Sequence, residues 1–298
     1  MADARVSVVV VTLNALPWVQ RALESVRGEE TIVVDHGSTD GTLDLVRTRF
    51  PEAVVVEQPN RGLGAGWNAG IARGSGDYVL LLNADAWLVD DALARLVAFA
   101  DSRPDAAYVG PRLLNPDGTV QRSVRAFPTV WRLATEYLFL RKLAPRSQAL
   151  NAFYASGFDH DEVREADWLM GACMLVRRAA IEQVGGLDER YFLFNEETDW
   201  CYRLRRAGWS VVFYPGAEAV HVGGATHGGR FFREQVRGQL LFLLEHHGER
   251  EAERARRMLR AALRLRGFAF PGERGRMYAD AARWLATGRA RELVAAGR

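Results

Sequence analysis

Acidic side chains and one imidazole that are far apart in the chain could together bind a charged ligand. Asp35 and Asp85 each end an apolar segment, Glu196 and Glu197 open a helical one, and His221 follows another apolar segment. Each acid alone is also explained as a helix cap, and the histidine as a half-buried strand residue. Several uncompensated carboxylates at one edge stabilise nothing, so the whole set predicts a bound cation and a diphosphate.

Residues 77–85, DYVLLLNAD, are expected to form the central strand of the fold. Consecutive apolar residues between a glycine-rich turn and an acid indicate a strand buried on both faces, as in a parallel or mixed sheet covered by helices. The end of this strand delivers Asp85 to the edge of the sheet. Ligands of open α/β sheets bind at that edge, where a carboxylate can hold a divalent cation against a phosphate.

The elements around this strand alternate in the pattern of a doubly wound half-sheet. Strands are expected at 6–12, 31–34 and 53–56, and helices over 16–27, about 43–50 and about 62–72. Pro17 is expected in the first turn of the first helix, with Leu16 facing the sheet. Glycines at 62, 64 and 66 match a dinucleotide fingerprint in form, but they follow the third strand and not the first, so we do not adopt that interpretation.

Helix and strand patterns also continue beyond residue 90. Helices are expected at about 90–100, 129–141, 178–184 and 196–207, and strands at 107–109, 112–114 and 167–176. Two edge strands are expected at 211–214 and 219–222. Residues 144–166 show neither period and are expected to form a mobile loop of the kind that covers an active site.

The composition is that of an ordinary globular protein, with 48% hydrophobic residues in a chain of 298. It excludes a fibrous or wholly disordered chain. We find no signal peptide and no apolar run near about 18 residues, so we expect a cytoplasmic protein that does not span a membrane. Cys173 and Cys201 are expected to be buried thiols without a disulfide or a zinc site. No nucleic-acid partner is expected.

A basic, helical region begins at residue 228. From there to the end the chain has 16 Arg and 8 Asp or Glu, although the net charge of the whole chain is only +2. Helices are expected over 231–247 and 249–265, and the second has an apolar face made of Ala252, Ala255, Leu259, Ala262 and Leu263. Such a helix fits an anionic membrane surface, or packs against the first domain or a second subunit. Peripheral membrane contact and a homodimer therefore both stay open.

Motifs in a fixed order make the chain resemble a family 2 glycosyltransferase with the GT-A fold, particularly the bacterial rhamnosyltransferase-like members. The motifs are VVDHGSTDG at 33–41, NRG at 60–62 with NAG at 68–70, LLNAD at 81–85, GACMLVRR at 171–178, and GLDE at 186–189 through NEETD at 195–199. The resemblance implies an α/β fold with a Rossmann-like mixed sheet flanked by helices. It divides the chain into a catalytic domain over 1–227 and a basic helical appendage over 228–298. The nucleotide-sugar half would span about 1–100 and the acceptor half about 101–227.

The resemblance also implies roles for single side chains. The residues that would contact the nucleotide are Thr12, Asn14, Asp35, Arg61, Asn68, Asn83 and Ala84. Asp85 would bind Mg²⁺ or Mn²⁺, and His221 matches a position that can complete the metal site. Asn83 departs from the D-x-D motif of the family, because an amide brings no negative charge.

Glu197 matches the position of the catalytic base in the family. The base takes the proton of the acceptor hydroxyl while that oxygen attacks the anomeric carbon of the sugar. The family usually has Asp at this position, so Glu196 remains an alternative. The amino terminus of the helix is expected to keep either acid ionised near neutral pH.

The activity implied by the resemblance is inverting transfer of a sugar from a nucleotide-sugar donor to a hydroxyl of a glycan acceptor. The first choice is rhamnose from dTDP-rhamnose and a polyprenyl-diphosphate-linked acceptor in cell-envelope polysaccharide synthesis. The alternatives are a UDP-sugar donor (galactofuranose or GlcNAc) and an inactive nucleotide-binding scaffold. A nucleotidyltransferase would need a glycine-rich loop with a basic residue after the first strand, which TLNAL at 12–16 does not supply.

Overall fold

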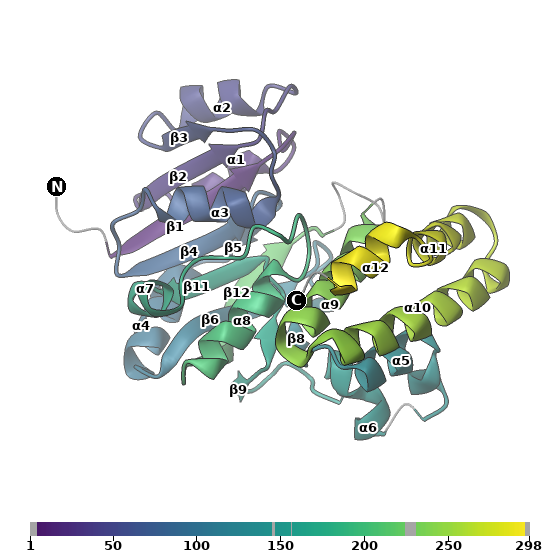
Figure 1. Ribbon diagram of the computed structural model, residues 1–298. Helices are drawn as coiled ribbons and strands as arrows, with labels where there is room; N and C mark the ends of the chain where they lie inside the picture. The colour runs from purple at the N-terminus through teal and green to yellow at the C-terminus, as the bar shows by residue number, and fades with distance from the viewer. Residues whose placement is uncertain (1–4, 145–146, 156, 224–230, 296–298) are drawn as a thin grey trace.

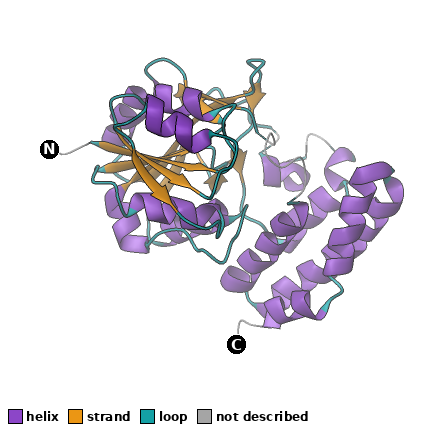
Figure 2. Cartoon of the chain, turned by 90° about the horizontal axis from the view of Figure 1, so that it is seen from above, coloured by secondary structure: helices purple, strands orange, loops and turns teal. Residues whose placement is uncertain are grey.

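A computed structural model describes residues 5–144, 147–155, 157–223 and 231–295. Its centre is a mixed sheet with the strand order β3-β2-β1-β4-β11-β6-β12-β5, covered by helices on both faces (Figure 1). A separate layer of helices lies beside the sheet (Figure 2). The predicted class, a mixed sheet flanked by helices with a helical appendage, is confirmed.

The first half of the sheet is parallel. In chain order its elements are β1 (Val6–Thr12), α1 (Val19–Glu24), β2 (Glu30–Asp35), α2 (Thr42–Arg49), β3 (Val54–Glu57), α3 (Leu63–Ile71) and β4 (Tyr78–Asn83). Alternation along β1 explains why apolar residues run on without a break. Val8 and Val10 pack on the face that carries α1 and α2, whereas Val9 packs on the face that carries α3.

The first helix is shorter than predicted. It begins at Val19, so the expectation of a helix over 16–27 is wrong at both ends. Pro17 precedes the helix, in a turn where the carbonyl of Ala15 accepts from the amides of Trp18 and Val19. Leu16, expected to face the sheet, is exposed.

The second half of the sheet is mixed. Its strands are β5 (Ala86–Leu88), β6 (Ala106–Leu114), β7 (Val120–Gln121), β9 (Arg164–Glu165), β11 (Cys173–Arg177) and β12 (Ser210–His221). The helices are α4 (Ala92–Ser102), α7 (Arg178–Val184) and α8 (Glu196–Arg206), while β8 (Val124–Arg125) and β10 (Trp168–Leu169) form a small sheet of their own. Cys173 and Cys201 are buried free thiols, as predicted.

Three predicted strand boundaries are wrong. The strands expected at 211–214 and 219–222 are one strand, β12, with an irregularity between Tyr214 and Glu218, and it lies inside the sheet between β6 and β5. The strands expected at 107–109 and 112–114 are likewise one strand, β6. The strand expected at 167–176 is divided at Gly171. The expected loop over 144–166 contains, in its described part, α6 (Gln148–Asn151), a 3₁₀ turn (Ala152–Tyr154) and β9.

The helical layer has its own apolar core. Its members are α5 (Val130–Tyr137), the 3₁₀ turn η1 (Leu140–Lys142), α9 (Phe232–His247), α10 (Glu249–Ala269), α11 (Gly272–Trp284) and α12 (Gly288–Ala295). The predicted apolar face of α10 is fully buried in this core, so it packs within the protein and does not face a membrane. No helix in the described part of the chain is long and apolar enough to cross a membrane.

Candidate active site

Asp85 and His221 meet at the carboxyl end of β4. His221 is the last residue of β12 and lies opposite Ala86 in β5, so strand pairing places it beside the residue before Ala86. Nε2 of His221 is 3.5 Å from Oδ1 of Asp85, and the two side chains are only 10% and 12% exposed. The structure thus brings together the two residues that we expected to bind a cation.

Asn83 and Ala84 lie in the same turn. Nδ2 of Asn83 is 3.4 Å from Nε2 of His221. The amide therefore borders the imidazole and the carboxylate, and both residues are half-buried. An amide oxygen is a weaker cation ligand than a carboxylate, so Asn83 adds polarity here without adding charge.

A chain of side-chain hydrogen bonds fixes the hydrogen on the far nitrogen of His221. The carboxylate of Asp117 can only accept, so the hydroxyl of Thr119 donates to it (2.6 Å) and accepts from Nδ2 of Asn115 (2.9 Å). Oδ1 of Asn115 then accepts from Nε2 of Gln121 (3.0 Å), which turns Oε1 of Gln121 toward Nδ1 of His221 (2.7 Å). Nδ1 must therefore carry a hydrogen.

Nε2 of His221, facing Asp85, is left to bind a proton or a cation. Burial alone would raise the pKa of Asp85, but the hydrogen bond and charge of His221 lower it below its usual value. That interaction requires a second hydrogen, on Nε2, unless a metal ion takes its place. A histidine whose far nitrogen donates to an acceptor is the usual arrangement of a metal-binding imidazole.

These residues fit a divalent cation as a partial ligand set. Asp85 supplies one carboxylate and His221 one imidazole nitrogen. Within the described ranges, no group of three or more His, Cys, Asp or Glu side chains could enclose a metal ion. The remaining ligands of a cation would thus come from a bound diphosphate and water, as is usual for Mg²⁺ at phosphates.

The predicted nucleotide residues Thr12, Asn14 and Asp35 surround the end of β2. Asp35 is fully buried, and its oxygens accept from Oγ1 of Thr12, the amide of Gly37, and the amide and hydroxyl of Ser38 at 2.5–2.8 Å. Asn14 has a left-handed backbone (φ 52°), and its Oδ1 accepts from the amide of Thr39 (2.8 Å). Both side chains therefore shape the loop, and a nucleotide would have to replace one of the donors to Asp35.

Arg61, which precedes α3, and Asn68, which lies within it, differ in how free their side chains are to bind a ligand. Arg61 is exposed at the start of the helix. Asn68 instead ties α3 to the following domain half, because its amide donates to the carbonyl of Leu187 (2.8 Å) and to Glu189 (3.1 Å) and accepts from the amide of Leu187. Both amide hydrogens of Asn68 are already donated within the protein, so neither is free for the expected contact with a nucleotide. These hydrogen bonds indicate a structural role for Asn68.

Glu196 and Glu197 open α8 after a strained turn. Phe194 and Asn195 both have left-handed backbones (φ 68° and 70°), an arrangement that non-glycine residues adopt rarely and mostly at functional sites. Glu196 is 2% exposed, whereas Glu197 is half-buried, and one oxygen of each lacks a hydrogen-bond partner among the described residues. Glu197 is thus the more exposed of the two residues, and its unpartnered oxygen is buried.

Glu197 lies at the same edge of the sheet as the Asp85 turn. A Cβ atom at Gly171 would lie 3.4 Å from Cγ of Glu197, and the neighbouring carbonyl of Ala172 accepts from the amide of Asn83 (3.0 Å). The register also aligns Thr12 with Asp35 and Val11 with Asn83. The nucleotide, cation and base candidates therefore share one edge.

Burial determines the charge of the two glutamates. It raises the pKa of Glu197 to about 7, and burial together with the charge of Glu197 raises the pKa of Glu196 well above its usual value. The pKa of Glu196 therefore shifts in the direction opposite to the one expected from the helix terminus. The loss of hydrating water disfavours the charged carboxylate more than the partial positive charge at the amino end of the helix favours it.

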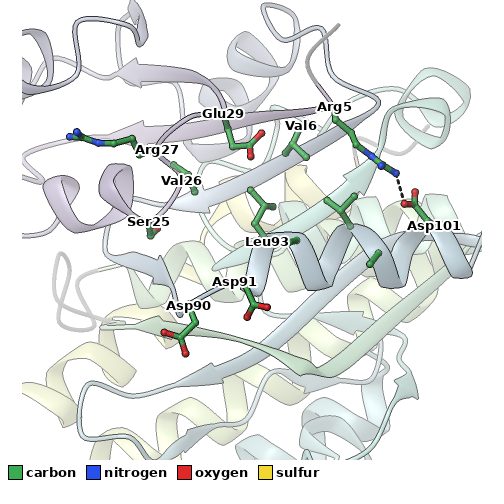
Figure 3. A pocket seen from close by; sticks show the side chains of 13 residues that line it. Arg5, Val6, Ser25, Val26, Arg27, Glu29, Asp90, Asp91, Leu93 and Asp101 are labelled. Carbon is green, nitrogen blue, oxygen red and sulfur yellow. Dashed lines mark hydrogen bonds and ion pairs between the residues drawn. The ribbon is translucent and has the colours of Figure 1, made fainter. Parts of the chain in front are cut away.

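A surface hollow also lies elsewhere in the described part of the chain. It measures about 480 Å³ and lies between the start of β1, the end of α1 and the helix α4 (Figure 3). Arg5 at its rim pairs with Asp101, and Asp91 pairs with Arg95. No candidate residue lines this hollow.

The family assignment follows from comparison with known proteins. The family model "Glycosyl transferase family 2" matches residues 7–185, more than half of the chain. The chain is a family 2 glycosyltransferase. A relative from Mycobacterium tuberculosis, N-acetylglucosaminyl-diphospho-decaprenol L-rhamnosyltransferase, is 32% identical to this transferase over 87% of this chain and 90% of its own length. The rhamnosyltransferase WbbL of Escherichia coli is 28% identical over 55% of this chain and 59% of its own length.

Solved structures show the same fold at low identity. The Staphylococcus aureus protein TarS (residues 1–349) matches 97% of the transferase and 83% of the solved chain, with a TM-score of 0.54 and 16% identity. The mannosyltransferase PcManGT of Pyrobaculum calidifontis, solved with GDP-Man and Mn²⁺, matches 100% of the transferase and 85% of that chain, with a TM-score of 0.54 and 17% identity. These similarities place the transferase in the GT-A fold class.

Two groups of residues in the transferase site were missed from the sequence. One is the hydrogen-bonded chain that runs from Asp117 through Thr119 and Asn115 to Gln121. The other is His246 on α9, whose Nε2 lies 2.7 Å from Oδ1 of Asp199 on α8. Neither has a local sequence signal, because each depends on contacts between segments that are distant in the chain.

Proposed function

We propose that the protein is a metal-dependent, inverting transferase that moves L-rhamnose from dTDP-rhamnose to a hydroxyl of a GlcNAc unit on polyprenyl diphosphate. The observation that carries the substrate assignment is the 32% identity, over nearly the whole length of both chains, to a rhamnosyltransferase named for that acceptor. The chemistry is supported by a half-buried carboxylate with an unpartnered oxygen, Glu197, at the same edge as the Asp85–His221 pair.

Glu197 acts as the general base in this proposal. Its carboxylate takes the proton of the acceptor hydroxyl, the hydroxyl oxygen bonds to the anomeric carbon, and the bond to the nucleotide diphosphate breaks on the opposite face. Glu196 is less suited, because it is buried and burial raises its pKa well above the usual value. A base with a pKa of about 7 is well matched to neutral conditions.

Asp85 and Nε2 of His221 would hold Mg²⁺ or Mn²⁺ against the donor diphosphate. The cation would offset the negative charge that develops on the leaving diphosphate. Arg61, exposed beside the nucleotide loop, would add positive charge at the donor. Asn83 would contact the cation at most through water, so we expect binding of the free ion to be weak and to tighten with the donor.

A polyprenyl-linked acceptor lies in a membrane, so we also propose that the transferase works as a peripheral membrane protein.

A donor panel tests this proposal. Thermal unfolding would be measured with dTDP-rhamnose, UDP-galactofuranose, UDP-GlcNAc and GDP-mannose, each with and without Mn²⁺ or Mg²⁺. A true donor at a hundredfold excess over its Kd stabilises the folded state by about 2.7 kcal/mol. We expect the largest shift with dTDP-rhamnose and metal, followed by rhamnose transfer to GlcNAc-diphospho-lipid. Equal, metal-independent shifts from all donors, without transfer, would support the inactive scaffold instead.

A further inference from the structure

Large apolar side chains are left in water at the outer end of the helical layer, where α10 leads into α11 (Figure 1). Phe268 is 87% exposed and Leu265 is 64% exposed on the last turns of α10. Leu143, just after η1, is 79% exposed. We call these three residues the apolar corner. Grouped apolar side chains on a surface mark a contact with a protein or a membrane.

Close contacts hold the two segments of the apolar corner together. Nε of Arg266 on α10 donates to the carbonyl of Tyr137 (2.8 Å), and its guanidinium lies 3.9 Å from the ring centre of Phe139. The rings of Phe139 and Phe270 are 5.8 Å apart. These contacts therefore fix the turn that carries Leu143 against the end of α10.

Cations surround the apolar corner. The basic residues of the same segments are Lys142, Arg260, Arg264, Arg274 and Arg276, against one exposed acid, Glu273. Within the part of the chain that the structure describes, no ion pair involves Arg260, Arg264 or Arg276. Apolar tips among unpaired cations are complementary to a bilayer interface with anionic headgroups.

We propose that the apolar corner inserts into the interface of a bilayer that contains anionic phospholipid and so docks the transferase beside its acceptor. This inference rests on the proposed function, because a polyprenyl-linked acceptor lies in such a bilayer. A second copy of the chain is a poor occupant. A two-fold dimer through this surface would bring the same cations against one another.

Vesicle sedimentation tests the docking surface. Full-length protein is mixed, without substrates, with vesicles of phosphatidylcholine alone or with added phosphatidylglycerol. We expect binding to the anionic vesicles that weakens with salt. The double variant L265S/F268S should bind at least about tenfold more weakly, since burying either side chain is worth a factor of about ten or more. R264Q/R276Q should lose only the preference for anionic lipid. V163S, at an exposed valine of a different loop, should bind like the wild type.

Separate readouts distinguish docking from folding and from the chemistry. We expect L265S/F268S to keep the Tm of the wild type and its rate on a short-chain, water-soluble acceptor, and to lose rate only on acceptor embedded in vesicles. The proposal is overturned if the wild-type protein does not bind anionic vesicles, or if the double variant binds them as tightly as the wild type. So does a wild-type dimer that the double variant converts to a monomer by light scattering. Failure of the wild type to glycosylate the soluble acceptor would instead overturn the proposed function and leave vesicle binding intact.

Discussion

Glu197 combines partial exposure with a raised pKa, and both follow from its place in the first turn of α8. Gly171 lies beside its side chain, and one of its oxygens is buried without a hydrogen-bond partner among the described residues. A base must be ionised to accept a proton. We therefore predict that kcat increases with pH up to a plateau, with a midpoint near the pKa of about 7. The profile would be measured at saturating donor and metal, with E196Q as the control that keeps the midpoint. A rate that is flat across this range would contradict the role of Glu197.

The same raised pKa predicts how stability depends on pH. The pKa of Glu197 rises from 4.5 to about 7 on folding, so the folded protein binds the proton more tightly and loses stability as pH rises through about 7. E197Q removes this loss. We expect the variant to be more stable than the wild type above pH 7, by up to about 3 kcal/mol, and equal below the unfolded pKa. Urea unfolding at several pH values measures the difference, with the exposed E52Q as a control. A difference that is constant with pH would argue against a buried, ionising Glu197.

Gln121 is predicted to tune metal binding although it does not face the metal. Its Oε1 accepts from Nδ1 of His221 and keeps Nε2 free for the cation. Loss of such a partner typically weakens metal affinity about 10- to 100-fold. We expect Q121L to weaken Mn²⁺ binding in the presence of dTDP by this factor, and Q121E, which can still accept, to retain most of it. Titration calorimetry without turnover measures the effect. Equal affinity in Q121L and the wild type would remove Gln121 from the site.

At the scale of elements, α9 supports the turn that presents Glu197, the proposed base. Gly238 packs so closely that a Cβ atom there would lie 2.6 Å from Nδ2 of Asn195 and 2.9 Å from the carbonyl of Phe194. His246, two turns later, pairs with Asp199 on α8. The helical layer is thus coupled to the catalytic turn, and a truncation before α9 would remove both supports.

We predict that G238A lowers kcat by about a hundredfold, because a shift near 1 Å in a catalytic group costs about that much. G267A, a helix glycine on α10 whose added methyl would contact only α11, is the matched control and should keep the wild-type kcat. Single-turnover rates and Tm would be compared for both. A G238A enzyme with a normal rate would show that α9 does not position the turn.

The sequence predicted the elements best where burial alone decides them. The unbroken apolar runs of β1, β2 and β4 indicated buried strands, and their ends indicated the edge that carries Asp35 and Asp85. The start of α1, the continuity of β12 and the break at Gly171 were missed, because turn geometry and pairing partners decide them. Among site residues, the hydrogen bonds of Asn68 to Leu187 and Glu189 were not predicted, because these partners lie in a distant segment. The raised pKa of Glu196 depends on packing in the same way.

At the scale of the whole molecule, the charge is unevenly distributed between the sheet domain, which is acidic, and the helical layer, which is basic. The acidic sheet domain carries the candidate donor site, and its carboxylates require a cation. The basic helical layer has a surface of arginines that ends in exposed apolar residues. Its helix α9 also packs against the turn before Glu197. In this proposal, different parts of the protein would thus bind the nucleotide-sugar donor and the membrane that contains the lipid-linked acceptor.

The central claim, that Glu197 is the base of a family 2 rhamnosyl transfer, is tested most directly with E197Q. Donor affinity would be measured by calorimetry with dTDP-rhamnose and Mn²⁺, and transfer to GlcNAc-diphospho-lipid by single-turnover kinetics. The account predicts unchanged donor affinity and a rate lowered about 10²- to 10⁴-fold. Transfer by E197Q at the wild-type rate would contradict it.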